Sequence, residues 1–257
     1  MKKLVLIFFL LCSPCWAGVS FDGADDKIAC GDVELVTRNL SISAWVYPTA
    51  DVSGFRGYIF SKCCGIVSYA FDADGTATPE NLGILVQGAS GLFACQAQEA
   101  DTSTILPTNT WTHVLVTRSG TNCAIYINGT SQTIDVNNLV DEDFQNSTDD
   151  IVIGGRDSDT LRQWNGYVNE VYLYNTSLTQ TNATLLSSSR LKGVGLQISG
   201  VVGYWPLNDK EAETSGDGDT FRDMASGANG TGDDGANNTG LTLTAETILN
   251  YPQGMAQ

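Results

Sequence analysis

WTHVLVTRSGTNCAIYING, residues 111–129, is the most informative stretch of the sequence. It contains two runs of β-forming residues, 114–116 and 124–127, joined by a Ser-Gly-Thr-Asn turn. The first run is apolar on both faces, which is typical of a strand between two packed layers. An Asn-Gly pair at 128–129 supplies the positive φ angles of a tight hairpin turn into residues 132–135. The stretch therefore predicts an antiparallel meander, beside which the other strands have to pair.

Short strand-like runs, separated by turn residues, continue on both sides of this meander. Residues 40–47 (LSISAWVY) alternate cleanly, with Leu, Ile, Ala and Val on one face and Ser, Ser, Trp and Tyr on the other. A polar segment at 179–191 is the only credible helix. Further strand-like runs lie at 19–21, 57–61, 67–71, 82–87, 92–96, 151–155, 166–174, 201–207 and 241–243. Many short strands split by Gly, Asn, Asp and Pro predict an all-β protein, an antiparallel two-sheet β-sandwich or jelly roll.

The first 17 residues have the pattern of a secretory signal peptide. Lys2 and Lys3 precede an apolar run at 4–11, and Cys-Trp-Ala at 15–17 forms a cleavage site. Lipid attachment at a cysteine of this segment is an alternative, which the lack of small residues just upstream disfavours. The apolar run is too short to span a bilayer, and no later segment offers a long one. We expect a secreted, periplasmic or cell-surface protein without membrane insertion.

The charge balance narrows the choice of partners. The chain carries 13 basic and 29 acidic residues, a net charge of −16, and loss of the two signal lysines makes it −18. Such a surface repels phosphates, so nucleic acid and anionic membranes are disfavoured. It fits an exported protein or one that binds cations.

Five cysteines lie outside the signal segment: Cys30, Cys63, Cys64, Cys95 and Cys123. An exported chain can oxidise them to at most two disulfides with one thiol left over, and the sequence does not select the pairing. A zinc site is the alternative. It is disfavoured because the chain has no Cys-x-x-Cys motif and only one histidine.

Six short motifs occur along the chain in an order that is characteristic of one protein family. They are Phe-Asp-Gly at 21–23, Ser-Ile-Ser-Ala-Trp-Val at 41–46, Trp-Thr-His-Val at 111–114, Tyr-Ile-Asn-Gly at 126–129, Ile-Gly-Gly at 153–155, and the block from 164 to 174. Together they resemble the laminin-G-like members of the concanavalin A-like lectin/glucanase superfamily. The resemblance implies a jelly-roll sandwich and places Trp45, Trp111 and Trp164 in its core.

One element departs from the family order. The Gly-Tyr-Trp-Pro-Leu element, which in the family precedes the first strand, follows the domain here at 203–207. Residues 200–257 are too few to bury a sandwich core of their own. We therefore expect residues 18–192 to form the sandwich, with a C-terminal strand and Gly/Asp/Asn-rich loops from 193–257 packing onto it like a permuted edge strand. A second domain cut short is the alternative.

Acid-rich turns raise the question of calcium, which prefers several oxygen ligands. None of these turns matches the EF-hand loop. The resemblance implies a structural Ca²⁺ between the first strand and the last long strand, which points to Asp22 and Asn169 as ligands. The alternative, that such acids only cap turns in water, stays open.

Sugar binding would use aromatic faces and planar polar groups on loops. The candidate ligand-binding residues are Phe55, Arg56, Tyr58, Arg156, Asp157, Asp159 and Arg162.

Catalysis is disfavoured on three grounds. No pair of glutamates spaced to face one cleft occurs, as glycan-cleaving relatives would require. Glu170 is isolated, and His113 lies inside an apolar strand, where a structural role is expected. We therefore expect a secreted, non-catalytic carbohydrate-binding or adhesive module, whose partner is a glycan or surface polysaccharide. A structural or assembly protein of a cell surface or virus particle, with a protein partner, is the alternative.

Overall fold

The computed structural model describes residues 18–35, 37–50, 56–62, 68–74, 81–98, 105–145, 147–156, 162–189, 191–207, 220–227, 229–233 and 242–243. The predicted signal segment lies outside these ranges. The first strands are β1 (Val19–Asp22), β2 (Lys27–Ala29), β3 (Asn39–Pro48), β4 (Arg56–Lys62), β5 (Tyr69–Asp74), β6 (Asn81–Gly88) and β7 (Gly91–Gln98). Next come β8 (Thr112–Ser119), β9 (Asn122–Ile127), β10 (Thr130–Ser131), β11 (Val136–Asn137), β12 (Ile151–Ile153) and β13 (Asn165–Tyr174). The chain continues with α1 (Gln180–Ser188), the 3-10 helix η1 (Val194–Gln197), β14 (Val201–Trp205), β15 (Thr220–Phe221), β16 (Gly230–Asp233) and β17 (Thr242–Leu243).

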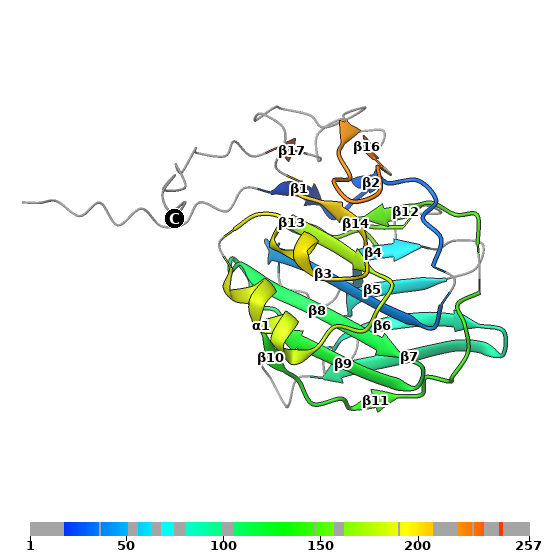
Figure 1. Cartoon of the computed structure of the whole chain (residues 1–257). Coiled ribbons are helices and arrows are strands. Elements are labelled where there is room, and N and C mark those ends of the chain that lie inside the picture. Colours follow the sequence, from blue (N-terminus) through cyan, green and yellow to red (C-terminus); the bar gives the residue numbers. More distant parts are fainter. Residues whose placement is uncertain are drawn as a thin grey trace, which may run out of the picture.

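Two antiparallel sheets form a sandwich (Figure 1), which confirms the predicted all-β jelly roll. The first sheet has the order β10-β9-β8-β3-β13-β1-β17, with β14 also paired to β13. The second sheet has the order β11-β7-β6-β5-β4-β12-β2-β16-β15. The predicted meander is β8-β9-β10, in the first sheet. Its last strand is β10 at 130–131, directly after the turn, and not the expected 132–135.

The main core lies between the sheets, and a second apolar layer lies on the outer face of the first sheet. Val114 and Val116 of β8 belong to the main core, whereas Leu115 between them belongs to the outer layer. This confirms that the strand is buried on both faces. Figure 1 shows α1 lying over β8 and β10, where it covers that part of the outer face.

The sequence of α1 explains where it starts and which side it buries. Thr179 and Asn182 form a capping box, with Asn182 N donating to Thr179 Oγ1 and Thr179 N donating to Asn182 Oδ1. Ala183 and Leu186 are its buried residues. None of the helices in the described ranges is long and apolar enough to cross a membrane.

The C-terminal segment supplies strands to both sheets. β14 pairs with Val171–Tyr174 of β13, beyond the point where β1 pairs with the same strand. Because β3 occupies the other edge of β13, β14 continues the line of β1 along the same edge. Trp205 and Phe221 are fully buried in the main core, and β16 pairs with β2.

Two expected core residues lie elsewhere. Trp164 is fully buried, as the family resemblance implies, but Trp45 and Trp111 are partly exposed, so that expectation is wrong for them. In β3 the core side is taken by Ala44 and Val46, and successive side chains alternate between faces. Trp45 therefore points to the outer face of the first sheet.

Candidate functional site

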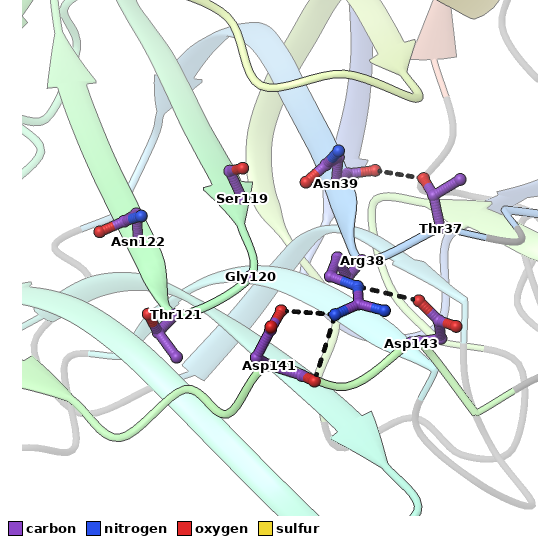
Figure 2. A pocket seen from close by; sticks show the side chains of 9 residues that line it. All are labelled: Thr37, Arg38, Asn39, Ser119, Gly120, Thr121, Asn122, Asp141 and Asp143. Atoms are coloured by element: carbon purple, nitrogen blue, oxygen red, sulfur yellow. Dashed lines mark hydrogen bonds and ion pairs between the residues drawn. The ribbon is translucent and has the colours of Figure 1, made fainter.

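A polar pocket of about 740 Å³ opens at one end of the first sheet (Figure 2). Three segments far apart in the sequence form it: the start of β3, the turn between β8 and β9, and the loop after β11. Its lining residues are Thr37, Arg38, Asn39, Ser119, Gly120, Thr121, Asn122, Asp141 and Asp143. We call it the rim pocket.

Arg38 stands between the two acidic residues of the rim pocket. Its Nη1 donates to Asp141 Oδ1 at 2.8 Å, and its Nε donates to Asp143 Oδ1 at 3.3 Å (Figure 2). The three side chains are exposed, and exposed ion pairs contribute little to folding stability. What they do is fix one guanidinium and two carboxylates in defined positions at the pocket.

Arg118 holds the loop that carries these acids. It is 2% exposed, and its Nη2 donates to the carbonyl oxygens of Val140 and Glu142, both at 2.8 Å, while its Nε donates to Gly120 O at 3.1 Å. Its guanidinium lies 4.8 Å from the ring centre of Phe144. One buried cation therefore ties the β8–β9 turn to the opposite wall.

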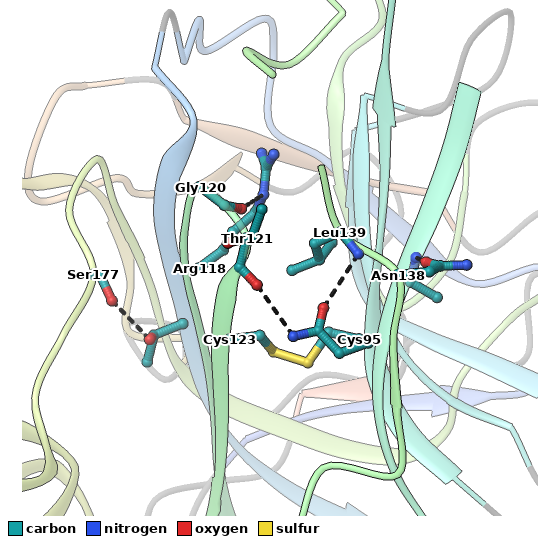
Figure 3. The surroundings of a disulfide bond; sticks show 11 residues. Cys95, Arg118, Gly120, Thr121, Cys123, Asn138, Leu139 and Ser177 are labelled. Carbon is teal, nitrogen blue, oxygen red and sulfur yellow. Dashed lines mark hydrogen bonds between the residues drawn. A yellow bond between two sulfur atoms is a disulfide. The ribbon is translucent and has the colours of Figure 1, made fainter. Parts of the chain in front are cut away.

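A disulfide at the start of β9 anchors the same β8–β9 turn to the second sheet. Cys95 of β7 is bonded to Cys123 of β9, which links the two sheets beside Asn122 (Figure 3). Asn137 Nδ2 donates to Thr121 O at 3.1 Å, and its Oδ1 accepts from Leu139 N at 3.2 Å. Cys30 is a buried free thiol, and Cys63 and Cys64 lie outside the described residues. The walls of the rim pocket are thus held by covalent and hydrogen bonds.

Four side chains at the pocket keep their hydrogen-bonding capacity. None of Asn39, Ser119, Thr121 and Asn122 makes a side-chain hydrogen bond with another described residue. They offer two hydroxyls and two amides along the β3 and β8–β9 side of the pocket, beside the Arg38 cluster (Figure 2). This arrangement can bind a polyhydroxylated molecule without first breaking internal contacts.

The structure brings together three of the residues predicted to bind sugar. Tyr58 N donates to Arg162 O at 2.9 Å, and the Arg156 guanidinium lies 6.0 Å from the Tyr58 ring centre. Tyr58 is only 3% exposed, so its ring is not presented to solvent. Arg56 contributes its backbone to β4. Phe55, Asp157 and Asp159 lie outside the described residues.

The two predicted calcium ligands do not lie together. Asp22 pairs with Asn165, whereas Asn169 lies beyond the opposite end of β1 and accepts the Glu170 N–H at 2.9 Å with its own Oδ1. Asp22 has two other acidic neighbours: oxygens of Asp22, Asp25 and Asp26 lie within 4.8 Å of one another. We call this group the acidic turn.

The acidic turn fits a hard cation. Oδ1 of Asp25 is buried and has no hydrogen-bond partner in the described part of the chain. A buried carboxylate oxygen without a donor or cation is costly. Asp22 N donates to Asp26 Oδ2 at 2.7 Å, which holds the turn closed with its carboxylates converging. Several convergent oxygens are what Ca²⁺ coordinates.

His113 is a buried, uncharged histidine. It is 1% exposed, and its Nε2 lies 2.8 Å from Ser43 Oγ. Burial lowers the pKa of His113 to about 3. A catalytic triad would need an acid at Nδ1, and this atom has no hydrogen-bond partner among the described residues. Its position inside β8 agrees with the structural role expected from the sequence.

The sequence model of the concanavalin A-like lectin/glucanases superfamily matches residues 22–183. The chain belongs to this superfamily. None of the curated proteins matches it in sequence.

Solved structures share this superfamily fold. A candidate carbohydrate binding protein from Bacteroides ovatus has a TM-score of 0.61 at 18% identity, over 89% of this chain and 60% of that one. A SAP-like pentraxin from Limulus polyphemus has a TM-score of 0.51 at 19% identity, over 67% and 82%. Tailspike protein 2 of an Escherichia coli bacteriophage has a TM-score of 0.50 at 10% identity, over 75% and 27%. At these identities the likeness concerns the fold alone.

Local sequence patterns did not indicate the rim pocket. Its acids lie within the polar loop after β11, and its arginine precedes β3, about a hundred residues away. The usable signal was the polar turn at 119–122, which ends beside Cys123. A disulfide next to a polar turn indicates a fixed loop. The sequence does not indicate that the loop after β11 forms the opposite wall of the pocket, because this contact exists only in the folded chain.

Proposed function

We propose that this protein is an exported carbohydrate-binding or adhesive module without catalytic activity, and that the rim pocket holds its glycan. One observation carries the proposal: four uncommitted polar side chains lie beside a fixed arginine–aspartate cluster, in a pocket whose β8–β9 turn is anchored by a disulfide and by hydrogen bonds to the opposite loop. Sugar hydroxyls are bound by such convergent groups, and rigid walls reduce the entropy lost on binding.

The charge of the chain supports an uncharged glycan. The net charge is −16, and the rim pocket itself carries two carboxylates against one guanidinium. An acidic polysaccharide would be repelled both at long range and at the pocket. The partner we propose is therefore a neutral glycan or surface polysaccharide.

Calcium has a place in this proposal as a structural ion. Asp22, Asp25 and Asp26 would hold it, and it would neutralise converging carboxylates between β1 and β2. A hydrogen bond connects the acidic turn to β13, since Asn165 Nδ2 donates to Asp22 O at 3.1 Å. Calcium would stabilise this end of the sandwich, away from the rim pocket.

Export is supported by two features. The first 17 residues have a signal pattern, and the Cys95–Cys123 disulfide requires an oxidising compartment to persist. A secreted, periplasmic or cell-surface location accommodates both.

A protein-binding role, as in an assembly of a cell surface or virus particle, has one observation in its favour. Leu185 of α1, Leu191 in the loop that follows and Leu196 of η1 are 40%, 63% and 39% exposed. Exposed apolar side chains on two neighbouring helices and the loop between them can serve as a protein contact. The rim pocket has no such apolar character, so we place this role second.

The test uses residues 18–257 on a broad array of neutral and acidic glycans, with calcium and with chelator. We expect selective binding of neutral glycans, which a Thr121→Ala/Asn122→Ala variant weakens at least ~10-fold because two hydrogen bonds are lost. The matched control is Thr130→Ala/Ser131→Ala in β10, at the other end of β9, which should bind like the wild type.

Chelator should lower the melting temperature and leave the glycan preference unchanged. An Asp25→Asn variant should remove this response to calcium. A folded protein that binds no glycan on the array would contradict the proposal and favour the protein-binding role.

A further inference from the structure

Four aromatic side chains are partly exposed on the outer face of the first sheet, at the end opposite the rim pocket. They are Trp45 and Tyr47 of β3, Trp111 just before β8, and Tyr167 of β13. We call them the aromatic surface. Their neighbours along the strands, such as Val46 and Val168, fill the main core, so the aromatic residues face outward.

The rings of the aromatic surface hold one another in place. The Tyr47 ring centre lies 5.5 Å from that of Trp111 and 5.6 Å from that of Tyr167, and Trp111 and Tyr167 are 6.3 Å apart. Trp45 rests edge-on against the buried His113 ring at 5.3 Å. Rings that already contact each other lose little freedom when a ligand stacks on them.

Hydroxyl groups accompany the rings in a row across the strands. Ser20 pairs with Tyr167, and Tyr167 pairs with Tyr47. The row from β1 to β8 crosses three inter-strand spacings, about 14 Å. The hydroxyls of Ser20, Tyr47 and Tyr167 make no hydrogen bond with another described residue. The surface thus combines apolar ring faces with free hydroxyls.

The other half of this face is already occupied. There α1 and η1 pack against the outer layer, which includes Leu115, Tyr126 and Tyr172. None of the four members of the aromatic surface belongs to that layer. The helices α1 and η1 therefore leave them accessible.

The size of the aromatic surface favours a small occupant over a protein. An aromatic side chain buries about 150–250 Å² when covered, so four partly exposed rings, each showing about a third of its area or less, offer at most roughly 200–350 Å². A stable protein interface needs about 800 Å² per partner. A second copy of this chain would also bring its own large negative charge.

The charges around the aromatic surface favour an uncharged ligand over an anionic one. None of the residues paired with the aromatic surface in the described strands is lysine or arginine, and Asp22 lies on the same face at the end of β1. An anionic ligand would find no cation among these paired residues of the described strands. The C–H faces of neutral sugar rings stack on aromatic rings, and their hydroxyls pair with free hydroxyls.

We propose that the aromatic surface binds a chain of uncharged sugar rings, as a second glycan site separate from the rim pocket. The inference rests on the proposed carbohydrate function but does not require the rim pocket. Sugar rings lie along the row from Trp111 through Tyr47 to Tyr167, and hydroxyls of the chain bond to Ser20 and the tyrosines.

The experiment titrates residues 18–257 with neutral hexasaccharides of glucose, xylose and mannose, and with hexagalacturonate as an acidic counterpart. Calorimetry measures affinity, and tryptophan fluorescence detects changes at the partly exposed Trp45 and Trp111 against the buried Trp164 and Trp205. We expect a neutral hexasaccharide to bind more tightly than its disaccharide and to change the fluorescence. Trp111→Ala and Tyr167→Ala should each weaken binding about 10-fold, whereas Trp111→Phe should keep most of it.

The controls separate this inference from the proposed function. Thr121→Ala/Asn122→Ala tests the rim pocket, Leu92→Ala removes an exposed apolar side chain on the second sheet, and thermal unfolding verifies that every variant folds. Loss of binding in the rim-pocket variant alone would overturn the aromatic site and leave the proposed function standing. Loss in the aromatic variants alone would establish the aromatic site and remove the rim pocket.

Three further outcomes would also overturn the inference. They are hexagalacturonate binding as tightly as the neutral chains, the absence of any hexasaccharide binding, and a dimer in light scattering that Trp111→Ala dissociates.

Discussion

Glu170 shows how a single buried residue joins several elements. It lies in the bulge of β13 with a φ of 50°, which is uncommon for a residue with a side chain. Its carboxylate accepts the hydroxyls of Tyr172 and Tyr204, both at 2.8 Å, and the N–H of Gly193 at 3.1 Å. The two tyrosine rings stack at 4.3 Å. One carboxylate therefore ties β13 to β14 and to the turn before η1.

The ionisation of Glu170 should make the stability of the protein depend on pH. Burial raises the pKa of Glu170, and this outweighs the hydrogen bonds from Tyr172 and Tyr204, which lower it. The folded state then binds this proton more tightly than the unfolded chain does. The stabilisation is complete below the ordinary glutamate pKa of about 4.3 and is lost as pH rises through the raised value.

Glu170→Gln, which is uncharged at every pH, isolates this effect. As pH rises from 4 to 7, the difference in unfolding free energy should shift in favour of the variant, measured by urea unfolding. Glu142→Gln is the matched control with the opposite sign, because the hydrogen bond from the Ser90 hydroxyl lowers the pKa of Glu142. A shift in favour of the wild type at position 170 would show that the tyrosine hydrogen bonds outweigh burial.

At the scale of elements, the Cys95–Cys123 disulfide has two roles. It joins β7 of the second sheet to β9 of the first, and it closes a loop across 28 residues. A cross-link of this length stabilises a fold by about 3–4 kcal/mol in the chain-entropy model. It also anchors the β8–β9 turn, whose side chains line the rim pocket.

A Cys95→Ala/Cys123→Ala variant should lose both contributions. We expect the unfolding free energy to fall by about 2–4 kcal/mol and the melting temperature by roughly 5–15 °C, measured by calorimetry. Affinity for the rim-pocket glycan should fall as well, since the turn becomes mobile. Cys30→Ser changes the buried free thiol and leaves the cross-link intact, so it should retain the glycan affinity. Unchanged stability in the double variant would show that the cross-link does not restrain the native chain.

At the scale of the whole molecule, alternation and turn residues were enough to predict the sheets, because each strand must bury one face or both. The same alternation places Trp45 and Tyr47 opposite the apolar face of β3, and the structure confirms it. The family resemblance places Trp45 in the core instead and is wrong for that residue. The rim pocket could not be predicted, because it depends on the backbone contacts of Arg118 with a loop about 20 residues away. No local pattern encodes such a contact.

The C-terminal segment completes both the main core and the edge of β13. β14 extends the line of β1 along β13, and Trp205, Leu207 and Phe221 are buried in the main core. Loss of the segment opens a large cavity between the sheets and leaves Val171–Tyr174 of β13 paired on one edge only, with β3. Trp205→Ala alone should cost about 3–5 kcal/mol.

Deletion of residues 200–257 should therefore abolish cooperative thermal unfolding, measured by calorimetry and near-ultraviolet circular dichroism. Met224→Ala, which changes a 57% exposed residue of the same segment, should melt like the wild type. A truncated protein that melts at the wild-type temperature would mean that residues 18–199 close their own core. The segment would then belong to a separate unit, and the edge of β13 beyond β1 would be free to pair with another chain.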